Sequence, residues 1–122
     1  MSNRKENSTY SINEKIVHEE CDLIYAINKL GGRWKLYILS KLEGRKMRYK
    51  ELRDEIHPIT ERMLTLQLKA LEEDKLVKRT VYADVPPRTE YELTEYAKKL
   101  IPIWNSLIEW GGSHKEIMKE DL

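Results

Sequence analysis

The chain has 122 residues, 40% of them hydrophobic and 35% charged, which leaves room for one domain with a modest core. Its 22 Lys and Arg residues nearly balance 21 Asp and Glu residues, for a formal net charge of +1. This excludes the strongly basic composition of many nucleic-acid-binding proteins. No apolar run approaches the roughly 20 residues that cross a bilayer, the polar start of the chain predicts no signal peptide, and one cysteine cannot form an internal disulfide. We therefore expect a cytoplasmic protein.

The segment from Ser11 onward predicts a short amphipathic helix near the start of the chain. Ser11 and Glu14 match a capping box, and Ile12, Ile16 and Val17 fall on one helical face. This apolar stripe has no evident partner within a single protomer. Two interpretations stay open, a contact with a second subunit and a frayed tail.

Three more helices are predicted in the first half of the chain. An apolar stripe over residues 23–30 predicts a helix that Gly31-Gly32 ends. The next helix, over 33–42, places apolar side chains four residues apart on its inward face. A third, over 49–56, cannot continue through Pro58.

The segment after Pro58 predicts a helix with two unlike faces. Thr60 is a good N-cap for a helix that continues to about Asp74. Leu64, Leu68 and Leu71 share one narrow sector. The opposite sector holds Arg62, Thr65 and Lys69, with Leu66 beside them. Together with the preceding helix and the short connection between them, this is a helix-turn-helix layout.

The remainder predicts a hairpin and a last helix. Residues 77–82 and 88–93 alternate as strands around a turn that contains two prolines. Thr94 can cap a helix that reaches about Trp110 and is closed by Gly111-Gly112. Pro102 should bend this helix unless its missing N–H falls where a kink is wanted. Its apolar positions cover more than one face, so part of it is expected to bury against a second subunit.

These patterns favour duplex DNA as the ligand. On the helix after Thr60, Arg62 can pair with guanine, Thr65 can bond to several bases, and Leu66 can meet a thymine methyl group. A merely solvated helix face is the alternative. Contacts to the DNA backbone or from the wing are expected from Arg45, Lys46, Arg48, Lys50, Thr60, Lys69 and Arg88. Arg88 has a competing role, an ion pair with Asp84 or Glu90.

Catalysis has little support. The three histidines are far apart, with no pair at metal-ligand spacing, and no phosphate-binding loop or nucleophile motif is present. We expect no enzyme, no metal and no cofactor. Cys21 lies just ahead of a predicted helix, where backbone N–H groups favour the thiolate and the neighbouring carboxylates oppose it. A redox sensor and an inert buried thiol both remain open.

Four segments in order resemble the HxlR-type winged helix-turn-helix transcriptional regulators, over about three quarters of the chain. They are Gly31-Gly32-Arg33-Trp34, Arg48-Tyr49-Lys50-Glu51-Leu52, Ile59–Leu68 with Leu71–Val77, and Val85–Tyr91 with Leu93-Thr94. Each segment is a weak pattern alone, and the ordered set is specific.

The resemblance implies dimers built on the N- and C-terminal helices, and binding to inverted-repeat operators as repressor or activator. Some members sense oxidants or electrophiles through a cysteine at the place of Cys21. A modification there would change the spacing between the two reading heads. Two departures stand out: Lys75 occupies a position where the family often has Gly, and Leu66 one where a polar residue is common.

We therefore predict a mainly α protein with a small β-hairpin (α+β), a winged helix-turn-helix that dimerises through its terminal helices. The expected dimer contacts are Ile12, Ile16, Val17, Ile101, Trp104 and Ile108. A polar disordered tail is expected over 1–10, the domain with its dimerisation helices over 11–112, and a polar tail over 113–122. The homodimer would bind double-stranded DNA at half-sites about one helical turn apart, roughly 34 Å. The alternative is a winged-helix module that docks to protein without binding DNA. A small-molecule effector is possible but not indicated.

Overall fold

The computed structural model describes residues 21–120. The predictions for the start of the chain, including Ile12, Ile16 and Val17, therefore lie outside the described residues. The chain divides into two compact units between Arg33 and Trp34. Within residues 21–120, no helix is both long enough and apolar enough to span a membrane.

The first unit contains the helix α2, Asp22–Leu30, which begins after Cys21 and ends at Gly31. Both glycines after it are required by the backbone. A Cβ at Gly31 would lie 2.4 Å from the carbonyl oxygen of Ile27, and Gly32 has φ +92°, a conformation that other residues rarely adopt. The predicted end of this helix is confirmed.

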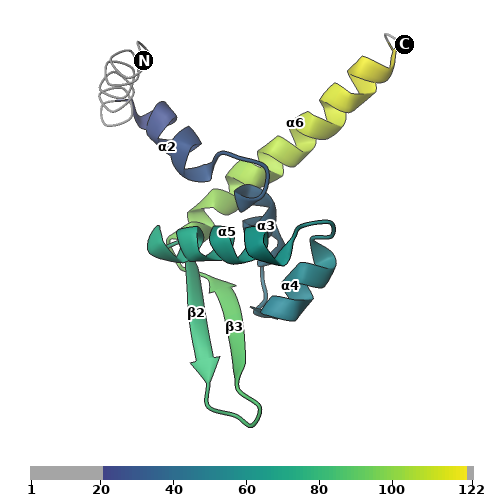
Figure 1. Ribbon diagram of the computed structural model, residues 1–122. Helices are drawn as coiled ribbons and strands as arrows, with labels where there is room; N and C mark the ends of the chain where they lie inside the picture. Colours follow the sequence, from purple (N-terminus) through teal and green to yellow (C-terminus); the bar gives the residue numbers. More distant parts are fainter. Residues whose placement is uncertain (1–20, 121–122) are drawn as a thin grey trace, which may run out of the picture. The chain divides into compact units, whose positions relative to one another are not determined.

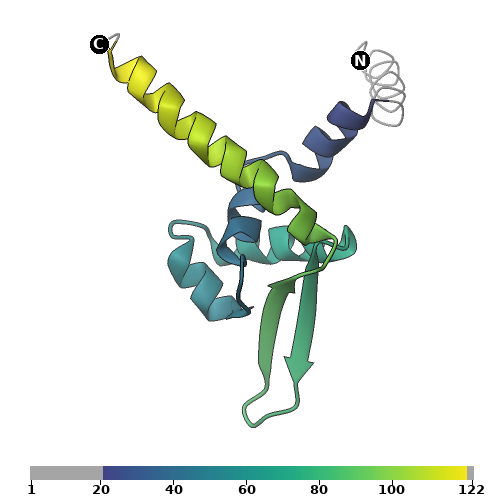
Figure 2. The same ribbon diagram turned by 180° about the vertical axis from the view of Figure 1, so that it is seen from behind.

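The second unit holds the remaining elements in the predicted order. They are α3 (Lys35–Lys41), β1 (Met47–Arg48), α4 (Tyr49–Glu55), α5 (Glu61–Glu73), β2 (Val77–Tyr82), β3 (Arg88–Leu93), a 3-10 helix (Ala97–Leu100) and α6 (Ile101–Glu120). In this unit the β2–β3 hairpin leads away from α5, and the C-terminal half of α6 leads away from the hairpin (Figure 1). The view from behind shows the same arrangement (Figure 2).

The core of the second unit is built from the apolar faces that the sequence predicted. Leu64, Leu68 and Leu71 of α5 are buried, as are Ile38 of α3 and Leu52 of α4. Because these side chains recur every three or four residues, each helix turns one stripe inward. Truncating one of the fully buried leucines to alanine is expected to cost about 2–5 kcal/mol of stability.

The sheet has three strands in the order β1-β3-β2, all antiparallel. The predicted hairpin is present, but the third strand, β1, was not predicted from the sequence. It has only two residues, with Met47 opposite Tyr91 and Arg48 opposite Glu90. Met47 is buried, so this short strand fixes the residues that lead into α4.

The chain leaves α5 at Lys75, directly after the C-cap residue Asp74, at the position where the resemblance leads us to expect Gly. Lys75 has φ +62°, so a lysine occupies the left-handed conformation usual for a C-terminal glycine. The Leu76 N–H donates to the Leu71 carbonyl at 2.9 Å, and the Lys75 N–H donates to the Glu72 carbonyl at 3.0 Å. The chain therefore closes the helix as a glycine would, with a less favourable residue in place.

The last helix differs from its prediction at both ends. The chain first forms the 3-10 helix with Tyr96 as its N-cap residue, and Thr94 Oγ1 accepts from the Ala97 N–H at 3.1 Å. Pro102 then lies in the first turn of α6, where its missing N–H is not needed. The predicted end near Trp110 is wrong, because α6 runs through Gly111-Gly112 to Glu120. Neither glycine has positive φ, so the pair does not form a C-cap and residues 113–120 are helical.

Candidate nucleic-acid interface

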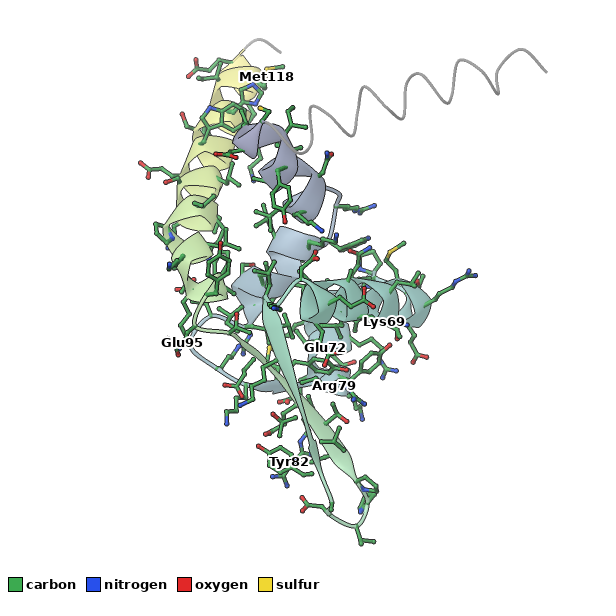
Figure 3. The ribbon with its side chains drawn as sticks, turned by 90° about the vertical axis from the view of Figure 1, so that its left-hand side faces the viewer. Lys69, Glu72, Arg79, Tyr82, Glu95 and Met118 are labelled. Carbon is green, nitrogen blue, oxygen red and sulfur yellow. The ribbon has the colours of Figure 1, made fainter. Side chains whose placement is uncertain are left out.

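The outer face of α5 carries the side chains predicted to read bases. Arg62, Thr65, Leu66 and Lys69 are all exposed, opposite the buried leucines. Leu66 is 52% exposed, so the outer face of α5 also presents one apolar side chain. Lys69 extends from α5 into solvent (Figure 3). The face therefore combines cations, a hydroxyl and one apolar side chain.

Thr60 works as the N-cap of α5. Its side-chain oxygen accepts from the Met63 N–H at 3.1 Å. The predicted cap is confirmed, and a phosphate contact from the same exposed hydroxyl stays a prediction.

The start of α4 lies against the first two turns of α5. The Tyr49 hydroxyl is 2.9 Å from the Glu61 carbonyl oxygen and 3.0 Å from Thr65 Oγ1. Arg53 of α4 forms an ion pair with Glu61. Arg48 and Lys50 flank Tyr49 in the sequence and are exposed. The sequence did not reveal the role of Tyr49, because this contact depends on how two helices meet.

The predicted backbone-binding cations fall into two groups. Arg45 forms an ion pair with Glu55 at 2.8 Å, and Lys46 lies 3.7 Å from Glu92. Among residues 21–120, no ion pair engages Arg48, Lys50, Arg62 or Lys69. We call these last four the open cations. Two lie at the start of α4 and two on the outer face of α5, a local placement that net charge alone does not indicate.

The wing holds its predicted arginine in an ion pair. Arg88 pairs with Asp84, and its guanidinium lies 4.3 Å from the centroid of the Tyr82 ring. One of the two expected roles, the pair with Asp84, is therefore present in the protein alone. Tyr82 lies toward the far end of the hairpin and Arg79 nearer to α5 (Figure 3). At the tip, Val85 is 99% exposed.

The predicted dimer contacts on α6 need one correction. Trp104 is only 3% exposed, and its Nε1–H donates to Glu43 Oε1 at 2.8 Å. It packs inside its own protomer and cannot offer area to a second one. Ile101 is half-buried, whereas Ile108 is exposed.

A different apolar stripe of α6 lies in solvent. At about 100° per residue, its members fall within one sector of roughly 100°. They are Ile103, Leu107, Trp110, Ile117 and Met118, all exposed. We call this set the α6 stripe. The sequence did not separate it from Trp104, because the predicted helix ended at Trp110 and omitted the second half of α6.

Cys21 is exposed and is the N-cap residue of α2. The expected burial of this thiol is therefore wrong, and an inert thiol and a redox sensor both stay open. Whether the thiol senses oxidants stays a prediction. Within residues 21–120, no group of three His, Cys, Asp or Glu side chains is arranged to hold a metal ion.

Residues 29–119 match the family model of the HxlR-like helix-turn-helix. The chain belongs to the HxlR family. The predicted membership is confirmed, and this HxlR-family protein is a helix-turn-helix transcriptional regulator and not an enzyme.

Relatives agree in sequence and in structure. An uncharacterized HTH-type transcriptional regulator of Methanothermobacter thermautotrophicus is 48% identical over 99 residues, 79% of this chain and 76% of the relative. The uncharacterized HTH-type transcriptional regulator YybR of Bacillus subtilis is 41% identical over 101 residues, 83% of this chain and 81% of the relative. The redox regulator HypR in its reduced form is 40% identical with a TM-score of 0.76, over 80% of this chain and 97% of that one.

Proposed function

We propose that this HxlR-family regulator binds inverted-repeat DNA as a homodimer and places α5 of each protomer in a major groove. The observation that carries the proposal is the set of open cations at the start of α4 and on the outer face of α5, which also carries an exposed threonine and an exposed leucine. A polyanion with apolar thymine methyl groups in its groove complements this surface. Arg62 reads guanine, Thr65 bonds to a base edge, and Leu66 meets a thymine methyl group.

The remaining cations position the protein on the phosphates. Lys50, Arg48 and Lys69 contact the backbone directly, with support from Thr60. Arg45 and Lys46 bind phosphate by exchanging their carboxylate partners. Exposed ion pairs contribute only about 0–1 kcal/mol, so such an exchange costs little. Arg88 contacts the flanking backbone or minor groove from the wing.

The α6 stripe supports the dimer. A set of exposed apolar side chains along one face of a helix marks an interaction surface. In a homodimer the same stripe on each protomer meets its copy across a two-fold axis. Two reading helices on one two-fold axis then require an inverted repeat in the DNA.

Selection of duplexes from a random pool tests the proposal, with the wild type, Arg62→Ala and Lys98→Ala compared. Lys98 is an exposed cation paired with Glu95. Glu95 lies across the second unit from Lys69 (Figure 3), which makes Lys98→Ala the matched control for charge removal. The wild type and Lys98→Ala should enrich one inverted repeat, and Arg62→Ala should lose its guanine positions with a roughly 5- to 100-fold weaker affinity. No enrichment at low salt would contradict DNA reading and favour a protein-docking module.

A redox response through Cys21 is a second proposal, supported by the exposure of the thiol and by the likeness to the redox regulator HypR. Treatment with hydrogen peroxide should lower the affinity of the wild type for its operator, and thiol reductant should restore it. Cys21→Ser should bind equally with and without oxidant. An equal loss of affinity in Cys21→Ser would remove Cys21 from the mechanism.

A further inference from the structure

The hydroxyl of Tyr49 joins two oxygen atoms of α5. It lies 2.9 Å from the Glu61 carbonyl oxygen and 3.0 Å from Thr65 Oγ1. Tyr49 is half-buried at the start of α4, whereas Thr65 faces solvent. Glu61 and Thr65 are one helical turn apart, so the Tyr49 hydroxyl contacts α5 at two positions on the side that is proposed to read bases.

Counting protons fixes the direction of both hydrogen bonds. A carbonyl oxygen has no proton to give, and a tyrosine hydroxyl has one. Tyr49 must therefore donate to the Glu61 carbonyl. Its oxygen keeps lone pairs but no second proton, so in the other bond the Thr65 hydroxyl is the donor. The only proton of that hydroxyl is directed inward, toward Tyr49.

A threonine hydroxyl normally serves a base edge either as donor or as acceptor. Here only its lone pairs face outward. In the major groove the donors are the amino groups of adenine and cytosine, whereas guanine and thymine offer acceptors at the corresponding positions. We propose that Tyr49 is a positioning residue that makes Thr65 an acceptor, so that α5 selects adenine or cytosine at the base Thr65 contacts. This inference rests on the proposed DNA reading by α5.

The experiment is duplex selection with the wild type, Thr65→Val, Thr65→Ser and Tyr49→Phe. Valine keeps the shape and the methyl group of threonine without the hydroxyl, so Thr65→Val locates the base pair that the hydroxyl reads. Serine keeps the hydroxyl and its bond to Tyr49. Tyr49→Phe keeps the ring and removes only the oxygen, which frees the Thr65 hydroxyl to rotate. Thermal melts of all four proteins confirm that they are folded.

We expect the wild type and Thr65→Ser to prefer adenine or cytosine at one position by about tenfold. In Tyr49→Phe that preference should fall below about twofold, with guanine or thymine admitted there and the other positions unchanged. A protein in which Tyr49 served only for stability would lose affinity at every position together. If Tyr49→Phe does not fold, the contrast of Thr65→Ser with Thr65→Val still tests the acceptor role.

Three results would overturn the inference. A wild-type preference for guanine or thymine at the Thr65 position would show a donating hydroxyl or a methyl contact, and the methyl contact would persist in Thr65→Val. A base preference unchanged in both Thr65→Val and Tyr49→Phe would remove the pair from reading. Both results leave DNA reading by α5 intact. Failure of the wild type to enrich any sequence would instead contradict the proposed function, and the inference with it.

Discussion

The helices α5 and α6 expose different chemistry for different reasons. The 13 residues of α5 bury three leucines, and its outer face carries cations and a hydroxyl. The 20 residues of α6 bury only Trp104, and its outer face carries the apolar α6 stripe. Water solvates the cations and the hydroxyl of the first surface, whereas it penalises the larger apolar area that the second leaves exposed. The comparison teaches that the exposed face of a helix, more than its buried face, indicates the partner it meets.

The largest loss of DNA affinity is expected from a charge placed in the α6 stripe. Leu107→Glu would bury one unpaired carboxylate from each protomer in an apolar contact, which costs several kcal/mol. The dimer should dissociate, and affinity for an inverted repeat should fall by at least about 100-fold because the two half-sites are no longer linked. Light scattering and operator binding measure both effects. Asn105→Glu, on the opposite side of α6, is the control, and a dimeric Leu107→Glu would contradict the proposed interface.

Removing single cations should cause a smaller loss of DNA affinity, and the loss should be larger for an open cation than for a paired one. Lys50→Ala should weaken binding about fivefold on every duplex and reduce the slope of log affinity against log salt by about one. Lys46→Ala should do less, since Glu92 already balances that charge in the protein alone. Fluorescence anisotropy over a salt series tests this order. Equal slopes for the two variants would show that the ion pair with Glu92 does not persist in solution.

On the wing, a substitution should raise the affinity for DNA by about threefold. Asp84→Asn removes the carboxylate that pairs with Arg88 and a negative charge that DNA would repel. Affinity at low salt should rise, and the rise should disappear when Arg88→Ala is added. A lower affinity in Asp84→Asn would mean that the pair positions the guanidinium for DNA.

The smallest change concerns stability and leaves DNA binding alone. Lys75→Gly removes a side chain from a left-handed position, where non-glycine residues cost about 1–2 kcal/mol, and the more flexible unfolded chain offsets part of the gain. We expect stability to increase by about 0.5–1 kcal/mol, seen as a higher Tm with unchanged operator affinity. A lower Tm would contradict the assigned cost of this backbone conformation.

Much of the fold follows from local rules that the sequence states directly. The leucine spacing of α5, the Thr60 cap and the glycine pair after Leu30 each determine structure within a few residues, and all three are confirmed. The end of α6 and the strand β1 were not predicted, because neither follows from the neighbouring residues alone. Gly111 and Gly112 lie within α6, and neither has the positive φ that a C-cap glycine adopts. The strand β1 exists only because Met47 pairs with a strand more than 40 residues away.

The residues of the candidate site were predictable from the sequence, but the side chains that they contact were not. The exposed face of α5 follows from helical periodicity, so Arg62, Thr65, Leu66 and Lys69 were expected there. The division of cations into open and paired was not predictable, since Glu55 and Glu92 approach Arg45 and Lys46 through tertiary packing. The hydrogen bond between Tyr49 and Thr65 depends on the same packing.

The most direct test of the account is sedimentation velocity of the wild type, Arg62→Ala and Leu107→Glu, each with a labelled duplex that carries the selected inverted repeat. At a protein concentration that saturates the wild type but lies below the weakened affinities of the variants, we predict two wild-type chains per duplex, a free dimer for Arg62→Ala and a free monomer for Leu107→Glu. Those results would assign α5 to DNA and α6 to the second protomer. A monomeric Arg62→Ala, or a Leu107→Glu protein that binds the duplex as the wild type does, would contradict that division.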